Sequence, residues 1–560
     1  MTPGILELTI ILGVAAILGL LARILKQPTI LAYILTGVVV GAFGISHIQN
    51  AELFATLSAL GIMFLLFLIG MEMNYDSLRL VGKASLMLGL GQIIFTAIGG
   101  FFIAVLLGFP FTASLYIAIA LTFSSTVIII KLLSEKGELY SLHGKLSIGF
   151  LLVQDFAAML ILLVLAGMGD NSANGMFDVA STLVKGIILF ILMMVLGRRT
   201  IPFLMEKISR SMELLFLTSL AWCLGVATVV SYSGFPIEIG GFLAGIALAN
   251  SSERYEISSR IKPLRDFFVL IFFVILGAGL VFSDFTGLSL PILLFSLFVL
   301  LGNPLIVIII MGVMGYRNKT SFMTGITVAQ ISEFSLIIAA LGLRLGHINM
   351  PVVSLITAVG ILTITISTYI ITYSDRIFVF LEEYLKIFER RNLLKDDLPA
   401  KTRYPLVLVG AHRLGQNLAS MLPKEKLLVV DFDPEIIKNL KSMGFTALFG
   451  DINDEDIKEE AGFGQAEMVI CTSPNLETNE DLLEDIKQLK KHPVLILRAE
   501  LEDDAKMLYK KDADYVIIPH LTAGHTLGKQ LADVGFDPGI LKHLKEKDLS
   551  YMEKSVPKSG

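Results

Sequence analysis

The chain has 560 residues, of which 54% are hydrophobic and 17% charged, with a net charge of −5 and a mean hydropathy of +0.74. These values lie far from those of globular proteins and fit a membrane protein with a soluble appendage. Two cysteines exclude a disulfide framework and a cysteine-based zinc cluster. Charged residues are sparse up to about Ser374 and frequent from about Thr402. The expected parts are a membrane domain at 1–374, a cytosolic linker helix at 375–401, a Rossmann-like domain at 402–525, and a C-terminal helix and tail at 526–560.

Apolar runs fill the first two thirds of the chain. A spanning helix needs about 20 apolar residues, and thirteen runs have roughly that length, the ninth being short. They cover 5–25, 29–44, 53–72, 85–108, 112–133, 146–167, 182–197, 212–231, 236–250, 266–282, 288–314, 320–343 and 351–373. The sequence therefore predicts a multi-pass α-helical membrane domain of about 13 transmembrane helices, the first of them retained as a helix.

Lysine and arginine gather in every second gap between these runs. The basic residues of these gaps are Arg23 and Lys26; Arg79 and Lys83; Lys131, Lys136 and Lys145; Arg198, Arg199, Lys207 and Arg210; Arg254, Arg260, Lys262 and Arg265; Arg317 and Lys319. The intervening gaps hold only Lys185 and Arg344. Because cytoplasmic loops concentrate Lys and Arg, we expect the N-terminus outside and the C-terminal domain in the cytoplasm.

A weak internal repeat links the two halves of the membrane domain. The segment 28–37 (PTILAYILTG) resembles 236–245 (PIEIGGFLAG), and Gly70 and Gly277 follow the two copies at similar distances. Seven runs separate the copies, so the second copy is inverted in the membrane. Inverted repeats that surround a midplane site of interrupted helices are a common plan of secondary transporters.

Polar residues interrupt two runs that are related by this repeat. The fifth run contains Ser124, Ser125 and Thr126, and the twelfth contains Gln330, Ser332 and Glu333. Polar side chains at this depth can satisfy the backbone of an unwound helix and coordinate a cation. We therefore expect both helices to be interrupted there, although such clusters also occur as contacts between helices.

Asp155 lies in the middle of the sixth run, at the same depth as these clusters. A carboxylate at the centre of a spanning helix costs about 3 kcal/mol on insertion scales, so such residues usually serve transport, proton relay or binding. The alternative is a carboxylate that is merely paired inside the bundle. Function is the stronger interpretation.

Six ordered motifs of the membrane domain resemble the Kef-type branch of the monovalent cation/proton antiporters, the cation:proton antiporter-2 family. The motifs are LIGMEM at 68–73, SSTVIIIKLL at 124–133, LLVQD at 151–155, GGFLAGIALANS at 240–251, RDFFVLIFFVILG at 265–277 and AQISEF at 329–334. The resemblance implies a fold with inverted repeats and crossed, interrupted helices, in a prokaryotic inner membrane. It also implies a homodimer and allows an ancillary regulatory subunit as a further partner.

The resemblance assigns roles to residues of this chain. Asp155, with Gln154 before it, is implied to bind a proton and a cation alternately, and the single aspartate suggests one cation for one proton. Further cation-site residues implied by the family are Ser125, Thr126, Gln330 and Glu333. Asn303 departs from the wider superfamily, because many relatives have Lys or Arg there.

Proton and cation exclude one another at such a carboxylate. Burial raises its affinity for a proton, and a bound cation lowers it. Alternating exposure of the site then produces antiport, with K⁺ as the cation favoured by the family branch and Na⁺ left open. A ligand-gated efflux system with channel-like flux is the runner-up, although the chain has no selectivity-filter motif such as TVGYG.

The C-terminal part predicts a second, soluble fold. Strand-like runs at 405–410, 427–431, 447–449, 468–471, 494–497 and 515–518 alternate with helical patterns. This alternation indicates a doubly wound parallel sheet. The domain resembles the TrkA-type (RCK) nucleotide-binding regulators of potassium transport, by the GD pair at 450–451 and IPHLTAG at 518–524.

The glycine motif of this domain is imperfect. The Gly-x-Gly-x-x-Gly fingerprint of dinucleotide-binding domains has His412 at its middle position here. AMP, or NAD(H) held in a different way, is the expected regulatory ligand, and a purely structural Rossmann fold is the alternative. The candidate nucleotide-binding residues are Gly410, His412, Arg413, Gly415, Asp431, Asp433 and Asp451.

Other functional classes fit less well. A membrane oxidoreductase needs an intact fingerprint and a redox partner, and the chain offers no nucleophile, base or metal set beside the turn. We therefore expect a transporter and no enzyme. The soluble domain leans acidic, which disfavours nucleic acid as a partner.

Overall fold

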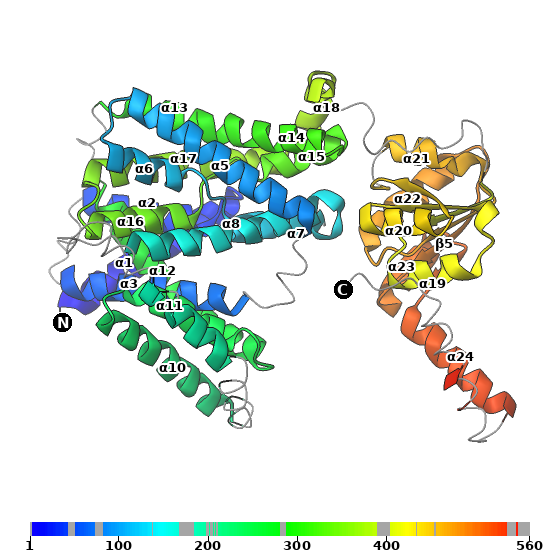
Figure 1. Cartoon of the computed structure of the whole chain (residues 1–560), viewed down its shortest axis with the longest axis horizontal. Coiled ribbons are helices and arrows are strands. Elements are labelled where there is room, and N and C mark those ends of the chain that lie inside the picture. Colours follow the sequence, from blue (N-terminus) through cyan, green and yellow to red (C-terminus); the bar gives the residue numbers. More distant parts are fainter. Residues whose placement is uncertain are drawn as a thin grey trace. The chain divides into compact units, whose positions relative to one another are not determined.

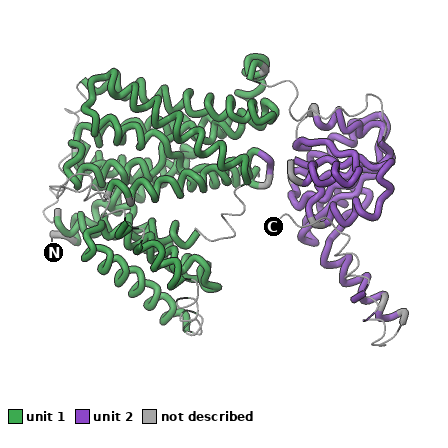
Figure 2. Tube along the Cα trace, viewed as in Figure 1, with its two compact units in different colours: residues 1–139, 143–389 green, residues 140–142, 390–560 purple. Residues whose placement is uncertain are grey.

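The computed structural model describes residues 3–42, 51–72, 82–136, 138–166, 184–186, 188–197, 201, 205, 208, 211–280, 287–388, 404–432, 434–452, 455–534, 542 and 545–546. These residues form two compact units, a helical one and an α/β one (Figures 1 and 2). Of the sequence-predicted site, Asp433 lies outside the described residues, as does the side chain of Arg413.

The first half of the helical unit contains α1 to α8. The elements are α1 (Pro3–Ile24), α2 (Thr29–Ala42), α3 (Ala51–Glu72), α5 (Lys83–Leu106), α6 (Phe111–Ala120), α7 (Thr126–Glu135), the 3₁₀ turn η1 (Glu138–Tyr140) and α8 (Leu142–Ala166). The fifth predicted run thus forms two short helices, α6 and α7, with five residues between them. This confirms the interruption that the polar cluster predicts.

The second half repeats the pattern. Its elements are α10 (Met212–Tyr232), α11 (Ile237–Leu248), α12 (Arg254–Ala278), α13 (Ser289–Leu297), the π-helical turn η3 (Phe298–Gly302), α14 (Asn303–Val313), α15 (Asn318–Ile326), α16 (Glu333–Arg344), α17 (Met350–Thr372), α18 (Ser374–Leu385) and the 3₁₀ turn η4 (Lys386–Phe388). The twelfth predicted run is likewise divided, into α15 and α16. Among the described residues, seven helices are long and apolar enough to cross a membrane.

One helix begins earlier than its apolar run predicts. The run starts at residue 266, but α12 starts at Arg254 and includes a charged segment. Arg260 and Glu256 form an ion pair one helical turn apart, 3.1 Å between Nε and Oε1. Such pairs support a helix beyond the apolar part, so hydropathy alone misses this start.

Glycines allow α2 to pack against α12 and α3 against α11 at very short range. A Cβ atom on Gly37 of α2 would lie 2.0 Å from the carbonyl oxygen of Val274, and one on Gly277 would lie 2.0 Å from that of Ile34. Gly70 and Gly245 make the same close approach between α3 and α11. Because the repeat relates Gly37 to Gly245 and Gly277 to Gly70, the two helix crossings are counterparts. The packing thus follows the inverted repeat.

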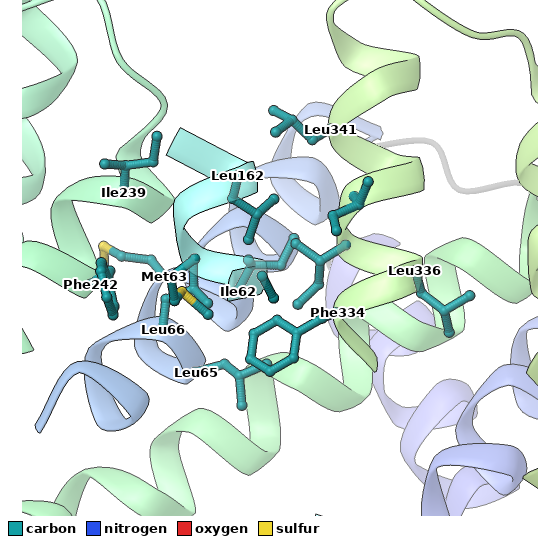
Figure 3. Close-up of a cluster of buried hydrophobic side chains, with 14 of the residues drawn as sticks. Ile62, Met63, Leu65, Leu66, Leu162, Ile239, Phe242, Phe334, Leu336 and Leu341 are labelled. Carbon is teal, nitrogen blue, oxygen red and sulfur yellow. The ribbon is translucent and has the colours of Figure 1, made fainter. Parts of the chain in front are cut away.

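A large apolar core joins these helices to α8 and α16 (Figure 3). Ile62, Leu65 and Leu66 of α3 lie beside Leu162 of α8 and Phe334 of α16. Phe334 directly follows the predicted site residue Glu333. The core therefore fixes the start of α16, where the site begins.

The α/β unit has a six-stranded parallel sheet with the order β3-β2-β1-β4-β5-β6. The strands are β1 (Leu406–Val409), β2 (Leu427–Asp431), β3 (Thr446–Phe449), β4 (Met468–Cys471), β5 (Val494–Arg498) and β6 (Tyr515–Ile517). Each of the six predicted strands is present, which confirms the doubly wound sheet. The order reverses between β1 and β4, and ligands of such sheets bind at that crevice.

Helices connect the strands. They are α19 (Arg413–Met421), the 3₁₀ turn η5 (Lys424–Lys426), α20 (Pro434–Ser442), α21 (Glu455–Ala461), the 3₁₀ turn η6 (Phe463–Gln465), α22 (Leu476–Gln488), α23 (Glu502–Lys510) and α24 (Pro519–Val534). The last helix runs without a break past residue 525, where the sequence predicts the end of the domain. The predicted linker segment starts with α18, which belongs to the helical unit.

Candidate functional site

The two interrupted helices meet inside the helical unit. The Ser124 hydroxyl, in the first break, lies 3.5 Å from the carbonyl oxygen of Val328 in the second break. Each break ends at a serine that caps the next half-helix. Ser125 accepts a hydrogen bond from the backbone N–H of Ile128 in α7, and Ser332 accepts one from Phe334 in α16. Such caps satisfy N–H groups that an interrupted helix leaves without partners.

Asp155 lies on α8 beside the first break. Its side chain is buried, and Thr126 Oγ1 donates a hydrogen bond to its Oδ2 over 3.0 Å. Thr126 is the first residue of α7, so the carboxylate is close to the N-terminus of that half-helix. A helix N-terminus favours negative charge. The structure thus places Thr126 against Asp155, with Ser125 next to Thr126 in the chain.

Glu333 occupies the corresponding place in the second break, as the first residue of α16. It is 6% exposed and accepts a hydrogen bond from the Ser332 hydroxyl, 3.2 Å from Oε2. Gln330 is fully buried, and its Oε1 accepts a hydrogen bond from Ser367 over 2.8 Å. Its Nε2 has no hydrogen-bond partner among the described residues. The Gln330 group that has no partner among the described residues is thus a hydrogen-bond donor, whereas a cation requires an oxygen as its ligand.

A cavity of about 940 Å³ reaches Glu333 from one end of the helical unit. Its acidic residues are Glu135, Asp266 and Glu333. Its basic residues are Arg23, Lys26, Lys131, Lys136, Lys262 and Arg265, all from gaps predicted to face the cytoplasm. Glu333 is thus the site carboxylate that lines the cavity, whereas Asp155 is not among its lining residues.

Neutral side chains surround the first break on its other side. Gln154 Oε1 accepts a hydrogen bond from the backbone N–H of Ser124 over 3.0 Å, and its Nε2 donates to Gln92 Oε1 over 2.5 Å. Asn303 Oδ1 accepts a hydrogen bond from the Thr96 hydroxyl over 2.7 Å. The predicted residues Gln154 and Asn303 are therefore connected through α5.

Sequence analysis did not identify Gln92 and Thr96. Both are fully buried on α5 and bond to each other, with Gln92 Nε2 3.0 Å from Thr96 Oγ1. The available signal is their spacing of four residues, which places two polar side chains on one face of an otherwise apolar helix.

The chemistry of this arrangement suits a small cation. Two buried carboxylates and several hydroxyl groups supply hard oxygen ligands, which monovalent cations prefer over nitrogen or sulfur. No Lys or Arg forms a hydrogen bond or ion pair with either carboxylate in the described part of the chain.

In the α/β unit, the turn after β1 keeps two of its three expected glycines for steric reasons. Gly410 has a φ of +82°, which favours glycine. A Cβ on Gly415 would lie 2.0 Å from the Gly410 carbonyl oxygen, so α19 packs directly on the turn. His412 stands at the start of α19 with an exposed side chain. An imidazole therefore occupies the position where a second glycine would admit a pyrophosphate.

Of the two acidic candidates, Asp431 contacts this turn, and Asp451 lies after the edge strand β3. Asp431 ends β2, and its Oδ2 accepts a hydrogen bond from the backbone N–H of Ala411 over 2.5 Å. Asp451 follows β3 and is 7% exposed. Thr472, after β4, donates a hydrogen bond to the Gly410 carbonyl oxygen over 2.8 Å, and Arg498 donates to the Thr472 carbonyl oxygen. Thr472 and Arg498 were not identified from the sequence, because nothing in their local pattern marks the switch point.

Comparisons with known proteins agree with both units. The family described as sodium/hydrogen exchanger, transmembrane, matches residues 11–373, and the TrkA-N domain matches residues 406–519. The chain is 27% identical over 551 residues to the putative cation/proton antiporter YbaL of Escherichia coli (strain K12), covering 94% of this chain and 97% of YbaL. It is 26% identical over 533 residues to the putative K(+) efflux antiporter KefB of Alkalimonas amylolytica, covering 93% and 80%.

A solved structure shares the fold of the helical unit. The sodium proton antiporter MjNhaP1 from Methanocaldococcus jannaschii aligns with 67% of this chain and 97% of its own, with a TM-score of 0.52 and 18% identity. At this identity the similarity concerns the fold.

Proposed function

The chain belongs to the sodium/hydrogen exchanger family and carries a TrkA-N domain, and on this premise we propose that it exchanges a monovalent cation for protons at Asp155 by alternating access. The observation that carries the proposal is the buried Asp155 carboxylate, bonded to Thr126 where the interrupted helices meet. The proposal implies a transporter and no enzyme.

Competition at one carboxylate couples the two ions. Burial disfavours the charged form of an acid, so the empty site takes up a proton, and a cation bound by the same oxygens displaces it. The bundle of α5 to α8 and α13 to α16 moves against α2, α3, α11 and α12, which exposes the site to either side in turn. The cavity at Glu333 is the path to the site from the side with the basic residues.

Potassium is the proposed cation. Relatives include proteins named K(+) efflux antiporters, and Asn303 is neutral at the position where a basic side chain would compete with the substrate. Sodium is the alternative, because MjNhaP1 is described as a sodium proton antiporter. The single aspartate of α8 supports exchange of one cation for one proton.

Proteoliposomes with an internal pH dye, challenged in turn with K⁺, Na⁺ and choline, test the choice of potassium over sodium. Potassium should drive proton movement at the lowest concentration, and a response to sodium alone would assign the alternative.

The TrkA-N domain is proposed to regulate this exchange by binding a nucleotide, AMP or NAD(H). The supporting features are the Gly410 turn at the crevice between β1 and β4, and Asp431, which bonds to that turn. Asp451, after the edge strand β3, is a further candidate. Calorimetric titration of the full chain with AMP, NAD⁺ and NADH tests it. The variant Gly415→Val should abolish binding, because its side chain would collide with the Gly410 carbonyl group. Gly464→Val is a matched control, since a Cβ there meets only a side-chain atom at 3.9 Å.

The proposal includes an orientation and partners. The chain would lie in a prokaryotic inner membrane as a homodimer, with the N-terminus outside, the α/β unit in the cytoplasm, and an ancillary regulatory subunit as a further partner. Channel-like flux is the alternative mode. It predicts potassium flux that needs no opposing proton gradient, whereas exchange predicts that collapse of the pH gradient by a protonophore changes the flux.

A further inference from the structure

We propose that Gln92 and Thr96 of α5 are positioning residues for the exchange site, which hold the first helix break in a charge-neutral hydrogen-bonded chain. The inference rests on the proposed exchange at Asp155. Both side chains are fully buried, and their hydrogen bonds go to amide, hydroxyl and backbone carbonyl groups. Neither belongs to the motifs by which the sequence resembles the antiporters.

The hydrogen-bonded chain begins at the backbone carbonyl groups that follow α6. Gln92 Nε2 and Gln154 Nε2 lie 3.2 and 3.3 Å from the Thr122 carbonyl oxygen, and Asn303 Nδ2 lies 3.4 Å from that of Leu121. An interrupted helix inside a membrane leaves such carbonyl groups without helical partners, and water is absent there. Three side-chain amides therefore replace the missing helical hydrogen bonds.

The hydrogen bonds all point in one direction. Gln154 donates to Gln92, Gln92 donates to Thr96, and Thr96 donates to Asn303. Gln154 Nε2 points at Gln92 Oε1 and at the Thr122 carbonyl oxygen, so Gln154 Oε1 faces the backbone N–H of Ser124. Gln154 directly precedes Asp155, and Ser124 lies two residues before Thr126. The hydrogen-bonded chain thus fixes two segments of the site, the one with Thr126 and the one with Asp155.

Neutrality is the second property of this chain. The C-terminal end of a helix such as α6 attracts cations, and a Lys or Arg side chain would satisfy it. Such a group would also place a permanent positive charge next to Asp155 and oppose cation binding. Amides and a hydroxyl satisfy the same carbonyl groups and leave the carboxylate available to the substrate.

The inverted repeat places this hydrogen-bonded chain at the junction of the two halves of the membrane domain. Thr96 and Asn303 are 207 residues apart, as are Gly70 and Gly277. Thr96 and Asn303 are therefore repeat counterparts that bond to each other.

The two breaks, however, are held differently. Ser124 has Ile331 as its counterpart, 207 residues later. The backbone N–H of Ser124 donates to the Gln154 amide, whereas that of Ile331 donates to the Thr363 hydroxyl over 3.4 Å. Among the described residues, the amide chain thus supports the break beside Asp155, and a hydroxyl group supports the other break.

The test compares cation dependence of exchange in proteoliposomes for Thr96→Val, Gln92→Met and Thr96→Ser. Loss of one buried hydrogen bond should raise the half-saturating cation concentration about tenfold for Thr96→Val and Gln92→Met. The maximal rate should change little, and Thr96→Ser should restore the wild-type value. Thr357→Val is the matched control, because Thr357 is also fully buried but donates only to Val353 within its own helix.

Several outcomes would overturn the inference. One is an unchanged half-saturating concentration in both variants while the wild type exchanges. Another is failure of both variants to fold while Thr357→Val folds, which would assign a purely structural role. Absence of exchange in the wild type would instead refute the proposed function.

Discussion

Arg344 at the end of α16 binds Glu238 in the first turn of α11 through two parallel hydrogen bonds, Nη1 to Oε1 at 2.8 Å and Nη2 to Oε2 at 3.1 Å. The two residues lie at an apolar pocket of about 310 Å³ between α3, α11 and α16. Glu333 stands at the opposite end of α16. One half-helix thus carries a site carboxylate at its start and an ion pair to the neighbouring bundle at its end.

Removal of Arg344 should destabilise the protein measurably. Arg344→Gln leaves the buried Glu238 carboxylate without its partner, which we expect to cost about 1 to 3 kcal/mol, less than for a fully buried pair. Thermal unfolding in detergent measures the loss. Adding Glu238→Gln should recover most of it, and a double variant as unstable as the sum of both single variants would contradict this. Arg260→Gln, which breaks an exposed pair, should change stability by less than about 1 kcal/mol.

The glycine contact between α2 and α12 should tolerate no side chain. Gly37→Ala places a methyl group against the Val274 carbonyl oxygen, and we expect a loss of about 1 to 3 kcal/mol or failure to fold. Gly19→Ala in α1 is the control, because a Cβ there has no neighbour within 4 Å. The yield of monodisperse protein and its unfolding temperature report the effect. Equal behaviour of the two variants would show that the helices separate easily.

Glu138 should contribute stability that depends on pH. Burial raises its pKa, but hydrogen bonds and charges from His143 and Lys136 outweigh burial and leave the pKa below its ordinary value of 4.5. The carboxylate contacts Lys136 Nζ at 2.8 Å and His143 Nε2 at 3.2 Å, and Asp375 also contacts Lys136. Because the folded-state pKa is lowered, the contribution is complete above about pH 4.5 and is lost as pH falls below it.

The measurement is the difference in unfolding temperature between wild type and Glu138→Gln, taken at pH values above and below 4.5. The difference should be largest near neutral pH and shrink in acid. Glu135→Gln serves as the control, since its pair with Lys131 is exposed and 3.7 Å long. A difference for Glu138→Gln that stays constant into acid would contradict the expected role.

Cys471 at the end of β4 should resist alkylation. Burial raises the pKa of its thiol to about 12, with a small opposing effect of a backbone hydrogen bond from Ser473. The thiolate fraction near neutral pH is then on the order of a thousandfold below that of free cysteine. Maleimide should add to a Cys223→Ser variant only after denaturation, as measured by intact mass. Rapid labelling of the native variant would show that β4 opens readily.

The sequence predicted those parts of the fold that local patterns determine. Apolar runs and strand alternation located the helices and all six strands, and the serines at 125 and 332 marked the two helix breaks. Contacts between distant residues were out of reach. Arg344 was seen only as an isolated basic residue, because its partner Glu238 lies 106 residues away.

In the candidate site, too, local patterns could be predicted and contacts between distant residues could not. Asp155 and Thr126 could be placed together because a family motif and a polar cluster converged on one depth. The Thr96–Asn303 bond joins residues from two halves of the chain, and only the folded arrangement of α5 and α14 reveals it. Polar residues four apart in an apolar helix are the signal that deserves a search in similar chains.

Proton flux in sealed proteoliposomes with an internal pH dye, for wild type and Asp155→Asn, tests the proposed exchange most directly. Asparagine keeps the size of the side chain but can neither release a proton nor bind a cation as a carboxylate does. We expect potassium-driven proton movement in the wild type and in the surface control Glu256→Gln, and none above empty liposomes in Asp155→Asn. Flux that persists unchanged in Asp155→Asn would remove this carboxylate from the mechanism.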